Sequence, residues 1–506
     1  MMHNINSYIG RFKQPAKLYL DRVTKKNQLN TPVKQTAFYA TKGTAVSILL
    51  EQAKIPIETK QGITYKKMSI GIRNGIISQI GQFSSKEYDH KLNVGGKLVT
   101  PGFIDSHSHL FHPSRRSDEY VSRLSYKTTH QQGGGIMASV DEFRRLPVED
   151  IVAINTLIIK QKIKNGVTTL ELKTGYGGNI EHESKAIDAI NRLQDYFKDE
   201  LVIKKTLLIH ALPKEYAKRR AEYIEMVCNE MIPALASQVD FFDVFCDDLA
   251  FTIDETEQMC NVAKQYNLPI KLHVDQFPSS KHELSGVELG VRLGAVSVDH
   301  LEYITQKGLS ALKNSKIIAT ILPTTAYSLG EQQAPVEKLL NYNIPLAIAS
   351  NTNPGSSLVV NPFEVMDMAN KLSRMPIETG YLGMTKYAAM ALNCNSGQLK
   401  AGYDANILIW PQPINTIDDL VYFRQFGFEP IGKLVKSTYV NNDHLSLKVE
   451  NEVQRSRLNK DQEKVLDFIC SIDVSENGII QSIPPYPKLD ESLPRAPKLN
   501  SNLNKQ

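Results

Sequence analysis

Short apolar runs alternate with helical stretches along the middle of this chain. The runs cover 98–104, Gly166–Leu172, Leu207–His210, Phe241–Val244, Pro269–His273, Ala295–His300, Ile317–Leu322 and Pro345–Ser350. Brief buried strands separated by helices are typical of βαβ units with a parallel sheet. Eight such units predict a closed (β/α)8 barrel, that is, an α/β fold whose chemistry lies at the C-terminal ends of the strands.

A different pattern flanks this region on both sides. Met68–Ile80 alternates apolar and polar residues around Asn74-Gly75, which is a strong signal for a two-residue hairpin. Strand-like patterning returns from Gly397 to about Val440 and is clearest over Gly402–Trp410. We therefore expect a small β unit in which the later segment pairs with the early hairpin.

The two chain ends have little periodicity. We expect an extension of uncertain order over 1–64, with ordered structure beginning near Tyr65. The first 50 residues hold eight Lys and Arg and one acid, Asp21, which faintly resembles an organellar transit peptide. They lack a clean amphipathic pattern, so a cytoplasmic protein is favoured. Over 441–506 we expect one charged helix, Leu447–Cys470, and then a polar, mobile tail.

Composition narrows the function classes. The chain has 506 residues, 42% of them hydrophobic, and a formal net charge of +5. Because Lys and Arg are scattered, nucleic acid is an unexpected partner, and no apolar run is long enough for a membrane span. Five cysteines without C-x-x-C spacing predict neither a disulfide framework nor a cysteine-rich zinc site. A small-molecule substrate and an intracellular setting fit best.

The run Pro101–Leu110 carries two histidines, His107 and His109, at a spacing that puts both on one face of a strand. His273 and His300 also end predicted strands. Three imidazoles and a carboxylate would hold one divalent ion with a position open for water. The carboxylate should follow the eighth strand, where the chain instead has Asn351.

Other strand ends supply polar groups. Glu171 and Lys173 lie two residues apart, a spacing that favours a structural ion pair over a functional role. Tyr176 follows on a glycine-flanked loop, and His210 ends the third strand. Arg115 and Arg116, shortly after the histidine pair, are candidates to bind a carboxylate. Gly133-Gly134-Gly135 lacks the Lys-Ser/Thr of a phosphate-binding loop and is interpreted as a flexible segment.

These motifs, in this order, resemble the amidohydrolase superfamily and, within it, the imidazolonepropionase family, over roughly residues 66–440. The motifs are Pro101–His109, Arg116 with Glu119-Tyr120, Tyr126 with Gly133–Ile136, Glu171–Gly177, His273–Gln276, Asp299–Tyr303, Leu322–Tyr327, Asn353–Ser356 and Gly397–Ala405.

The resemblance implies a distorted TIM (β/α)8 barrel over 101–394 and a small β-sandwich formed from both ends of the chain, over 65–100 and 395–440. It also implies a homodimer with one divalent metal ion, zinc or iron. The implied reaction is hydrolysis of 4-imidazolone-5-propanoate to N-formimidoyl-L-glutamate, in which a barrel aspartate accepts a proton from water and passes it to the leaving nitrogen.

Carried over by position, His107, His109 and His273 resemble the metal ligands, and Asn351 takes the slot of the aspartate that is both ligand and catalytic base. His300 resembles a catalytic histidine. The positions that resemble substrate contacts are Arg116, Tyr126, Tyr176, His210, Gln276, Asn353, Gly355 and Ser356.

Asn351 is the main departure, and Gln276, where glutamate is common, is a milder one. An amide coordinates weakly and cannot accept a proton at neutral pH. The chain is therefore a degenerate homologue, an engineered variant, or an enzyme that uses another base, such as His300, His112 or Asp299. Three functions stay open: an imidazolonepropionase with activity impaired by Asn351, a catalytically inactive binding protein of the same fold, and another cyclic-amide hydrolase or deaminase.

Overall fold

The computed structural model describes residues 47–83, 88–112, 116, 135–278, 285–423, 427–435, 438–441, 473–474 and 480–482. By its internal contacts the chain divides into two units, 1–442 and 443–506. In the second unit the described residues form a two-stranded sheet of β17 (Asp473–Val474) and β18 (Ile480–Ser482). The expected helix Leu447–Cys470 and the expected mobile tail lie outside the described residues.

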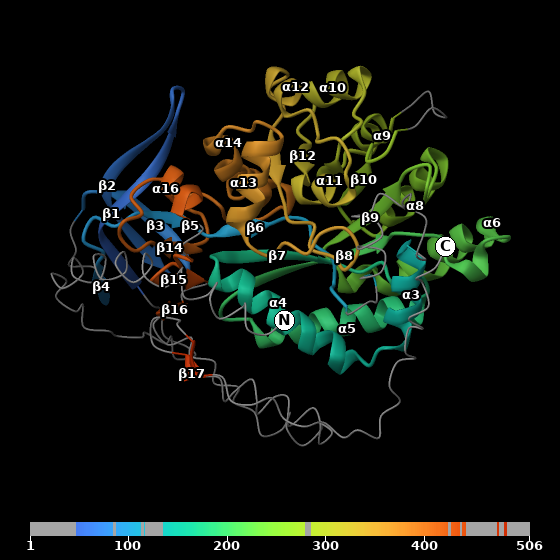
Figure 1. The fold of residues 1–506 in the computed structure, drawn as a ribbon, viewed down its shortest axis with the longest axis horizontal. Helices are drawn as coiled ribbons and strands as arrows, with labels where there is room; N and C mark the ends of the chain where they lie inside the picture. The colour runs from blue at the N-terminus through green and yellow to red at the C-terminus, as the bar shows by residue number, and fades with distance from the viewer. Residues whose placement is uncertain are drawn as a thin grey trace, which may run out of the picture. The chain divides into compact units, whose positions relative to one another are not determined.

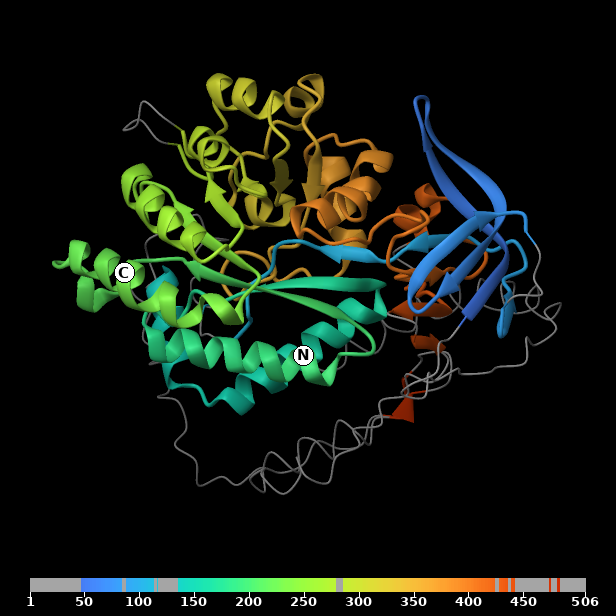
Figure 2. The same ribbon diagram turned by 180° about the vertical axis from the view of Figure 1, so that it is seen from behind.

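The first unit contains the predicted barrel (Figures 1 and 2). Eight strands lie in the order in which they occur along the chain, and each strand is parallel to the neighbour with which it pairs. They are β6 (Phe103–Asp105), β7 (Val167–Lys173), β8 (Val202–Ile209), β9 (Phe241–Cys246), β10 (Ile270–Val274), β11 (Ser297–His300), β12 (Ile318–Ile321) and β13 (Leu346–Ile348). The fold class predicted from the eight apolar runs is confirmed.

Helices connect and follow these strands. They are α3 (Gly135–Arg145), α4 (Val148–Lys164), α5 (Ile180–Tyr196), α6 (Arg220–Met226), α7 (Ile232–Leu235), α8 (Ile253–Gln265), α9 (Gly286–Leu293), α10 (Gln306–Lys313), α11 (Pro323–Leu329), α12 (Val336–Asn341), α13 (Pro362–Leu372), α14 (Ile377–Gly383), α15 (Lys386–Ala391) and α16 (Ile417–Tyr422). None of the helices in the described part of the chain is long and apolar enough to cross a membrane.

The barrel is distorted where its first and last strands meet, because β6 and β13 are the two ends of the strand ladder. Polar contacts connect them instead. The Asp105 carboxylate accepts hydrogen bonds from the backbone N–H (3.0 Å) and the hydroxyl (2.6 Å) of Ser350. The buried Lys162 ammonium on α4 donates to Asp105 (2.7 Å) and to the Thr352 hydroxyl (2.8 Å). These contacts hold the segments before His107 and around Asn351 together.

Two four-stranded sheets form the β-sandwich. One contains β1 (Ser47–Thr59), β2 (Gly62–Arg73), β3 (Ile76–Gly81) and β4 (His90–Asn93), and the other contains β5 (Val99–Pro101), β14 (Ile407–Ile409), β15 (Gly432–Val435) and β16 (Thr438–Asn441). Early and late segments thus lie side by side, as both views show. A buried apolar cluster that includes Ile55, Ile72, Val99 and Ile407 fills the space between the sheets.

Strand structure is present earlier in the chain than we expected, since β1 covers Ser47–Thr59, before Tyr65. Pro56 and the charged Glu51 and Lys54 hide the alternation of this strand. Proline is tolerated here because β1 pairs with β4 only over Ile48–Glu51, so the proline lies beyond the part of the strand that is paired on both edges.

The run at 98–104, expected to be one barrel strand, is two strands in different sheets, β5 and β6. Gly102 separates them, and a Cβ built there would lie 2.1 Å from the Thr168 hydroxyl. The expected pairing of Gly402–Trp410 with the hairpin holds only for its first half. There Ile77 donates to the Tyr403 carbonyl (2.8 Å), whereas β14 pairs with β5 and β15.

Candidate metal centre

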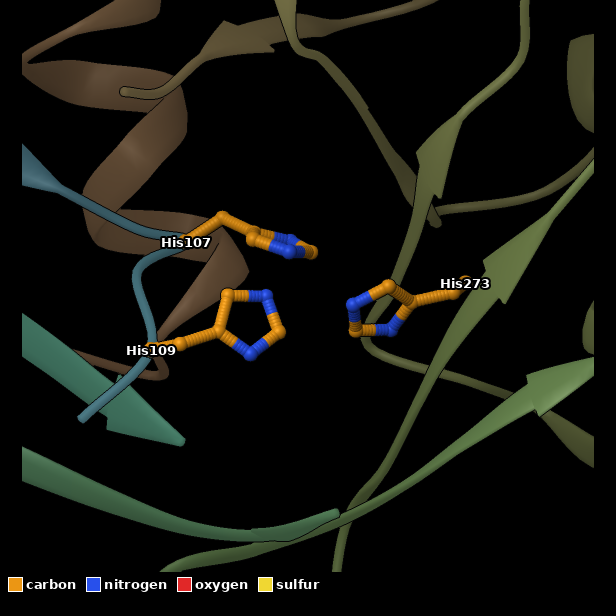
Figure 3. Close-up of side chains that lie close together, drawn as sticks. All are labelled: His107, His109 and His273. Carbon is orange, nitrogen blue, oxygen red and sulfur yellow. The ribbon is translucent and has the colours of Figure 1, made fainter. Parts of the chain in front are cut away.

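Three histidine side chains converge at the C-terminal end of the barrel (Figure 3). His107 and His109 lie on the extended segment that follows β6, and His273 lies near the end of β10. One ring nitrogen of each lies within 4.8 Å of those of the other two. The ring centroids of His107 and His273 are 4.4 Å apart. The alternation of side chains along the first segment therefore brings two imidazoles to a third from a distant strand.

Six buried side-chain atoms at this place have no hydrogen-bond partner among the described residues. Four belong to the three histidines and to Asn351, namely His107 Nε2, His109 Nδ1, His273 Nε2 and Asn351 Oδ1, and the other two are His210 Nδ1 and His300 Nδ1. Buried polar atoms are almost always satisfied, so a group of unsatisfied lone-pair donors indicates a ligand. Imidazole nitrogens suit zinc, copper, iron and nickel. The residues present therefore fit a divalent first-row cation.

The protonation of the three rings suits the same ligand. Burial, together with nearby Lys173 and neighbouring histidines, holds the pKa of His107 well below its ordinary value of 6.5. Burial also lowers the pKa of His109 and of His273, the latter against the opposing effect of Asp243. All three imidazoles are thus neutral at pH 7, which is the form that binds a metal.

Two buried carboxylates orient two of these rings. Asp299 Oδ2 lies 2.6 Å from His107 Nδ1, and Asp243 Oδ1 lies 3.1 Å from His273 Nδ1. A neutral ring beside a carboxylate donates its Nδ1–H, which leaves the lone pair on Nε2. The tautomer follows from the partner, and in both cases Nε2 is the unsatisfied atom.

Asn351 follows β13 and is held on two sides. Its backbone N–H donates to the His107 carbonyl (2.9 Å), and its side-chain amide donates to the Thr325 hydroxyl (2.8 Å). In this orientation of the amide, Oδ1 is the unpartnered atom. The backbone has φ of +46°, a left-handed conformation that Asn and Asp adopt more readily than most residues. Asn351 thus keeps the orientation of a ligand without the charge of a carboxylate.

A cavity of about 380 Å³ opens beside the histidines. Most of the sequence-predicted substrate contacts line it, together with two of the three histidines. The lining residues include His109, Arg116, Tyr176, His210, Gln276, His273, His300, Asn351, Asn353 and Ser356. Among the described residues that line it, none is a carboxylate and Arg116 carries the positive charge. Gly355, also a predicted contact, is described but is not one of the lining residues. Tyr126, the last predicted contact, lies outside the described residues, as do Arg115, Gly133 and Gly134.

Arg116 depends on Gly355 for its position. A Cβ built on Gly355 would lie 1.8 Å from Nη1 of Arg116, so only glycine leaves room for the guanidinium. The loop around Gly355 is shaped by the Asn353 side chain, whose Oδ1 accepts from the backbone N–H of Gly355 (2.7 Å) and of Ser356 (2.8 Å). Arg116, Asn353 and Ser356 line the cavity, and Gly355 leaves the space that Arg116 occupies.

The Tyr176 loop is held by a residue that sequence reasoning missed. Glu183, buried on α5, accepts from the backbone N–H groups of Gly175 (3.0 Å), Gly177 (2.8 Å) and Gly178 (2.8 Å). An acid five residues after a glycine-rich segment is a weak signal by itself. Burial raises the pKa of Tyr176 far above its usual 10.0, so the ring presents a neutral phenol.

His300 sits in a strained segment, since its φ is +91° and that of Leu301 is +71°. Consecutive non-glycine residues in this region cost energy and are typical of functional sites. Its Nδ1 lies 3.5 Å from a carboxylate oxygen of Glu302, which is beyond a normal hydrogen bond. Of the candidate replacement bases, Asp299 is already bonded to His107 and to the Ser297 hydroxyl (2.7 Å).

Fold and site define a metal-dependent hydrolase of the barrel type. Residues 98–437 match the Amidohydrolase family. An imidazolonepropionase of Verminephrobacter eiseniae (strain EF01-2) is 37% identical over 361 residues, which cover 70% of this chain and 77% of that protein. One from Vibrio cholerae (strain M66-2) is 37% identical over 349 residues, covering 67% and 85%. The chain belongs to the amidohydrolase family and, within it, to the group that contains the imidazolonepropionases.

Solved structures agree on the fold. A guanine deaminase from C. acetobutylicum superposes with a TM-score of 0.60 at 15% identity, covering 78% of this chain and 100% of that chain. A triazine hydrolase variant superposes with a TM-score of 0.64 at 14% identity, covering 81% and 97%. At this level of identity the likeness concerns the fold alone.

Proposed function

We propose that this protein is a metal-dependent hydrolase that opens the cyclic amide of 4-imidazolone-5-propanoate to N-formimidoyl-L-glutamate, a step of histidine degradation. We propose further that Asn351 lowers its turnover. The observation that carries the proposal is the group of unpartnered lone pairs on His107, His109, His273 and Asn351, next to a cavity whose charged lining residue is Arg116. The names and identities of the relatives support the same substrate.

Arg116 explains the choice of a ring that bears a propanoate chain. Its planar guanidinium can form two parallel hydrogen bonds to a carboxylate, which adds geometric selectivity to the charge. Tyr176, as a neutral phenol, and the amides of Gln276 and Asn353 can donate to carbonyl oxygens or accept from ring N–H groups. A small cavity lined by Arg116 and by such groups suits a small, singly charged, polar ring.

A divalent metal ion, when bound, lowers the pKa of water towards about 7 and polarises a carbonyl group. His107, His109 and His273 would hold it, and the Asn351 amide oxygen would be a weak fourth donor. His300 lines the cavity and can hold or release a proton at a ring nitrogen near the scissile bond. Asn351 cannot accept a proton at neutral pH, so proton transfer lacks the carboxylate that this family uses.

A second function, a binding protein that does not turn over its ligand, is favoured by one observation. Both positions where the resemblance implies a carboxylate in the cavity, 276 and 351, hold amides, and no carboxylate lines the cavity in the described part of the chain. Such a site retains affinity for an anionic ring but lacks the group that accepts the proton from water.

The test is to measure formimidoylglutamate formation and metal content together, in the native protein and in Asn351→Asp. Product from either protein with about one metal ion bound supports the hydrolase. Metal and ligand binding without product in either would leave only the binding protein. Asn343→Asp is a matched control, because Asn343 also has a positive φ (+56°) but is exposed and precedes β13, at the opposite end of that strand from Asn351.

From the family resemblance we also propose a homodimer in the cytoplasm with zinc or iron at the centre. Sedimentation of the purified protein, fractionation of its source cells and elemental analysis test these three points separately.

A further inference from the structure

Five charged side chains lie inside the barrel next to the metal centre. We call them the buried charge cluster: Glu171, Lys173, Asp243, Lys271 and Asp299. Each has no exposed surface. They come from β7, β9, β10 and β11, so no two strands alone could assemble them. The proposed function does not use this cluster, apart from the two carboxylates that touch histidines.

Lys173 contacts both of those carboxylates. Its Nζ donates to Asp243 Oδ2 (2.7 Å) and to Glu171 Oε1 (3.0 Å), and it lies 3.9 Å from Asp299 Oδ2. Asp243 holds His273 through its other oxygen, and Asp299 holds His107 through the same one. One ammonium group therefore lies between the supports of two candidate metal ligands.

Lys271 and Glu171 complete the arrangement. Lys271 Nζ lies 3.2 Å from Glu171 Oε2 and 3.9 Å from Asp299 Oδ2, and it donates to the carbonyl of Ser106, the residue before His107. Glu171 also accepts from the Thr206 hydroxyl at 2.5 Å. The cluster holds two lysines and three acidic side chains, and none of the five lines the cavity.

The main chain of Lys173 supports the same segment independently of its side chain. Its N–H donates to the Ser108 carbonyl (2.9 Å), and its own carbonyl accepts from the Leu110 N–H (2.8 Å). These bonds flank His109 and keep the segment in place when only the side chain is changed. A side-chain substitution at 173 thus tests the ammonium group and leaves the backbone frame intact.

We propose that Lys173 is a positioning residue of the metal centre, whose ammonium group fixes Asp243 and Asp299 together and thereby presents Nε2 of His273 and of His107 to one cation. Lys271 and Glu171 keep that ammonium group in place. The proposal rests on the metal site of the proposed function but not on its substrate. It replaces the interpretation of Glu171 and Lys173 as a purely structural pair.

The experiment uses Lys173→Met in the full chain, because methionine keeps an unbranched side chain and removes the charge. Zn²⁺ affinity is measured by competition with a chelator, and the Co²⁺-loaded protein is examined by visible absorption. We expect Zn²⁺ affinity to fall by about 10- to 100-fold, as for other changes of groups that orient metal ligands, with a shifted Co²⁺ spectrum.

Lys433→Met is the matched control, since Lys433 is equally buried, on β15, and its carboxylate neighbour is Glu200 at 3.6 Å. Its Zn²⁺ affinity should match the native value.

A folded Lys173→Met protein with native Zn²⁺ affinity and a native Co²⁺ spectrum would overturn the proposal. If that variant does not fold, a double variant, Lys173→Met with Asp243→Asn, removes one charge of each sign. Native Zn²⁺ affinity in the double variant would overturn the proposal equally. Nitrogen NMR of the metal-free rings separates this proposal from the proposed function. We expect native His107 and His273 to carry the proton on Nδ1 and Lys173→Met to show mixed tautomers, even if the native protein binds no Zn²⁺. Unchanged tautomers in the variant would count against Lys173.

Discussion

Strands β10 and β13 each bring one candidate metal ligand to the same cavity, His273 near the end of β10 and Asn351 after β13. A hydrogen bond orients each side chain, but the chemical groups that form the two bonds differ. At β10, the Asp243 carboxylate holds Nδ1 of His273 at 3.1 Å and leaves Nε2 without a partner. After β13, the Thr325 hydroxyl holds Nδ2 of Asn351 at 2.8 Å and leaves Oδ1 without a partner. Each side thus directs one lone pair into the site.

The difference lies in charge. The β10 side is supported by carboxylates and lysines of the buried charge cluster, whereas the β13 side presents a neutral amide supported by a neutral hydroxyl. The geometry that holds a metal ion is therefore separable from the group that accepts a proton. This chain keeps the first at both strands and lacks the second at β13.

Restoring the carboxylate at β13 should have the largest effect. We expect Asn351→Asp to raise turnover of 4-imidazolone-5-propanoate by about 10²- to 10⁴-fold, because general acid–base catalysis is worth that much. Aspartate tolerates the φ of +46°, and the Thr325 hydroxyl can donate to it, so no strain should offset the gain. Steady-state kinetics measure the change. Equal turnover in the two proteins would show that another group already serves as base.

Truncating each strand's ligand separates their contributions to metal binding. We expect His273→Ala to weaken Zn²⁺ binding by about 10²- to 10³-fold, and Asn351→Ala by about tenfold, because a neutral amide oxygen is the weaker ligand. Chelator competition measures both constants. Similar losses of Zn²⁺ affinity in the two variants would mean that His273 and Asn351 contribute equally to metal binding.

Arg116 should govern substrate binding and leave the metal site unchanged. We expect Arg116→Ala to raise KM about 10- to 100-fold, since hydrogen bonds to charged groups contribute roughly 1.5–3 kcal/mol. Gly355→Ala should raise KM as well, because its Cβ would displace the guanidinium. Arg145→Ala, at an exposed position on α3, is the control. An unchanged KM in Arg116→Ala would instead favour another cyclic-amide substrate.

Acid should destabilise the metal-free protein through the histidine side of the site. The folded pKa values of His107, His109 and His273 lie below the ordinary 6.5, so the unfolded chain binds more protons as pH falls below about 6.5. Stability is then fully present above that pH and is lost below it, by about 1.4 kcal/mol per pH unit for each proton. Urea unfolding at several pH values measures the slope. If the free energy of unfolding of His273→Gln has the same pH slope as that of the native protein, protonation of His273 does not contribute to the loss of stability.

Glu183 should have the smallest effect, through the Tyr176 loop. Glu183→Gln keeps the size but leaves one backbone N–H without an acceptor, so we expect roughly 1–3 kcal/mol of lost stability. A rise in KM of a few-fold should accompany it, with turnover nearly unchanged. Thermal unfolding and kinetics check both, with Glu181→Gln, exposed on the first turn of the same helix, as control.

Much of the fold was predictable because it depends on periodicity. The eight apolar runs predicted the barrel strands, and Asn74-Gly75 predicted the turn between β2 and β3. Two errors arose where a local pattern has more than one outcome. Pro56 concealed β1, and the continuous run at 98–104 gave no sign that Gly102 divides it between two sheets.

For the site, the amino-acid sequence alone determined which strand ends carry imidazoles and that Asn351 stands where a carboxylate was expected. Spacing decides the face on which a side chain lies, and this is a local property. Only the tertiary structure decided the partners: Asp243 for His273, Thr325 for Asn351, Glu183 for the Tyr176 loop, and Lys173 between two carboxylates from other strands. Those contacts join residues far apart in the chain, and they exist only after the barrel has brought its strand ends together.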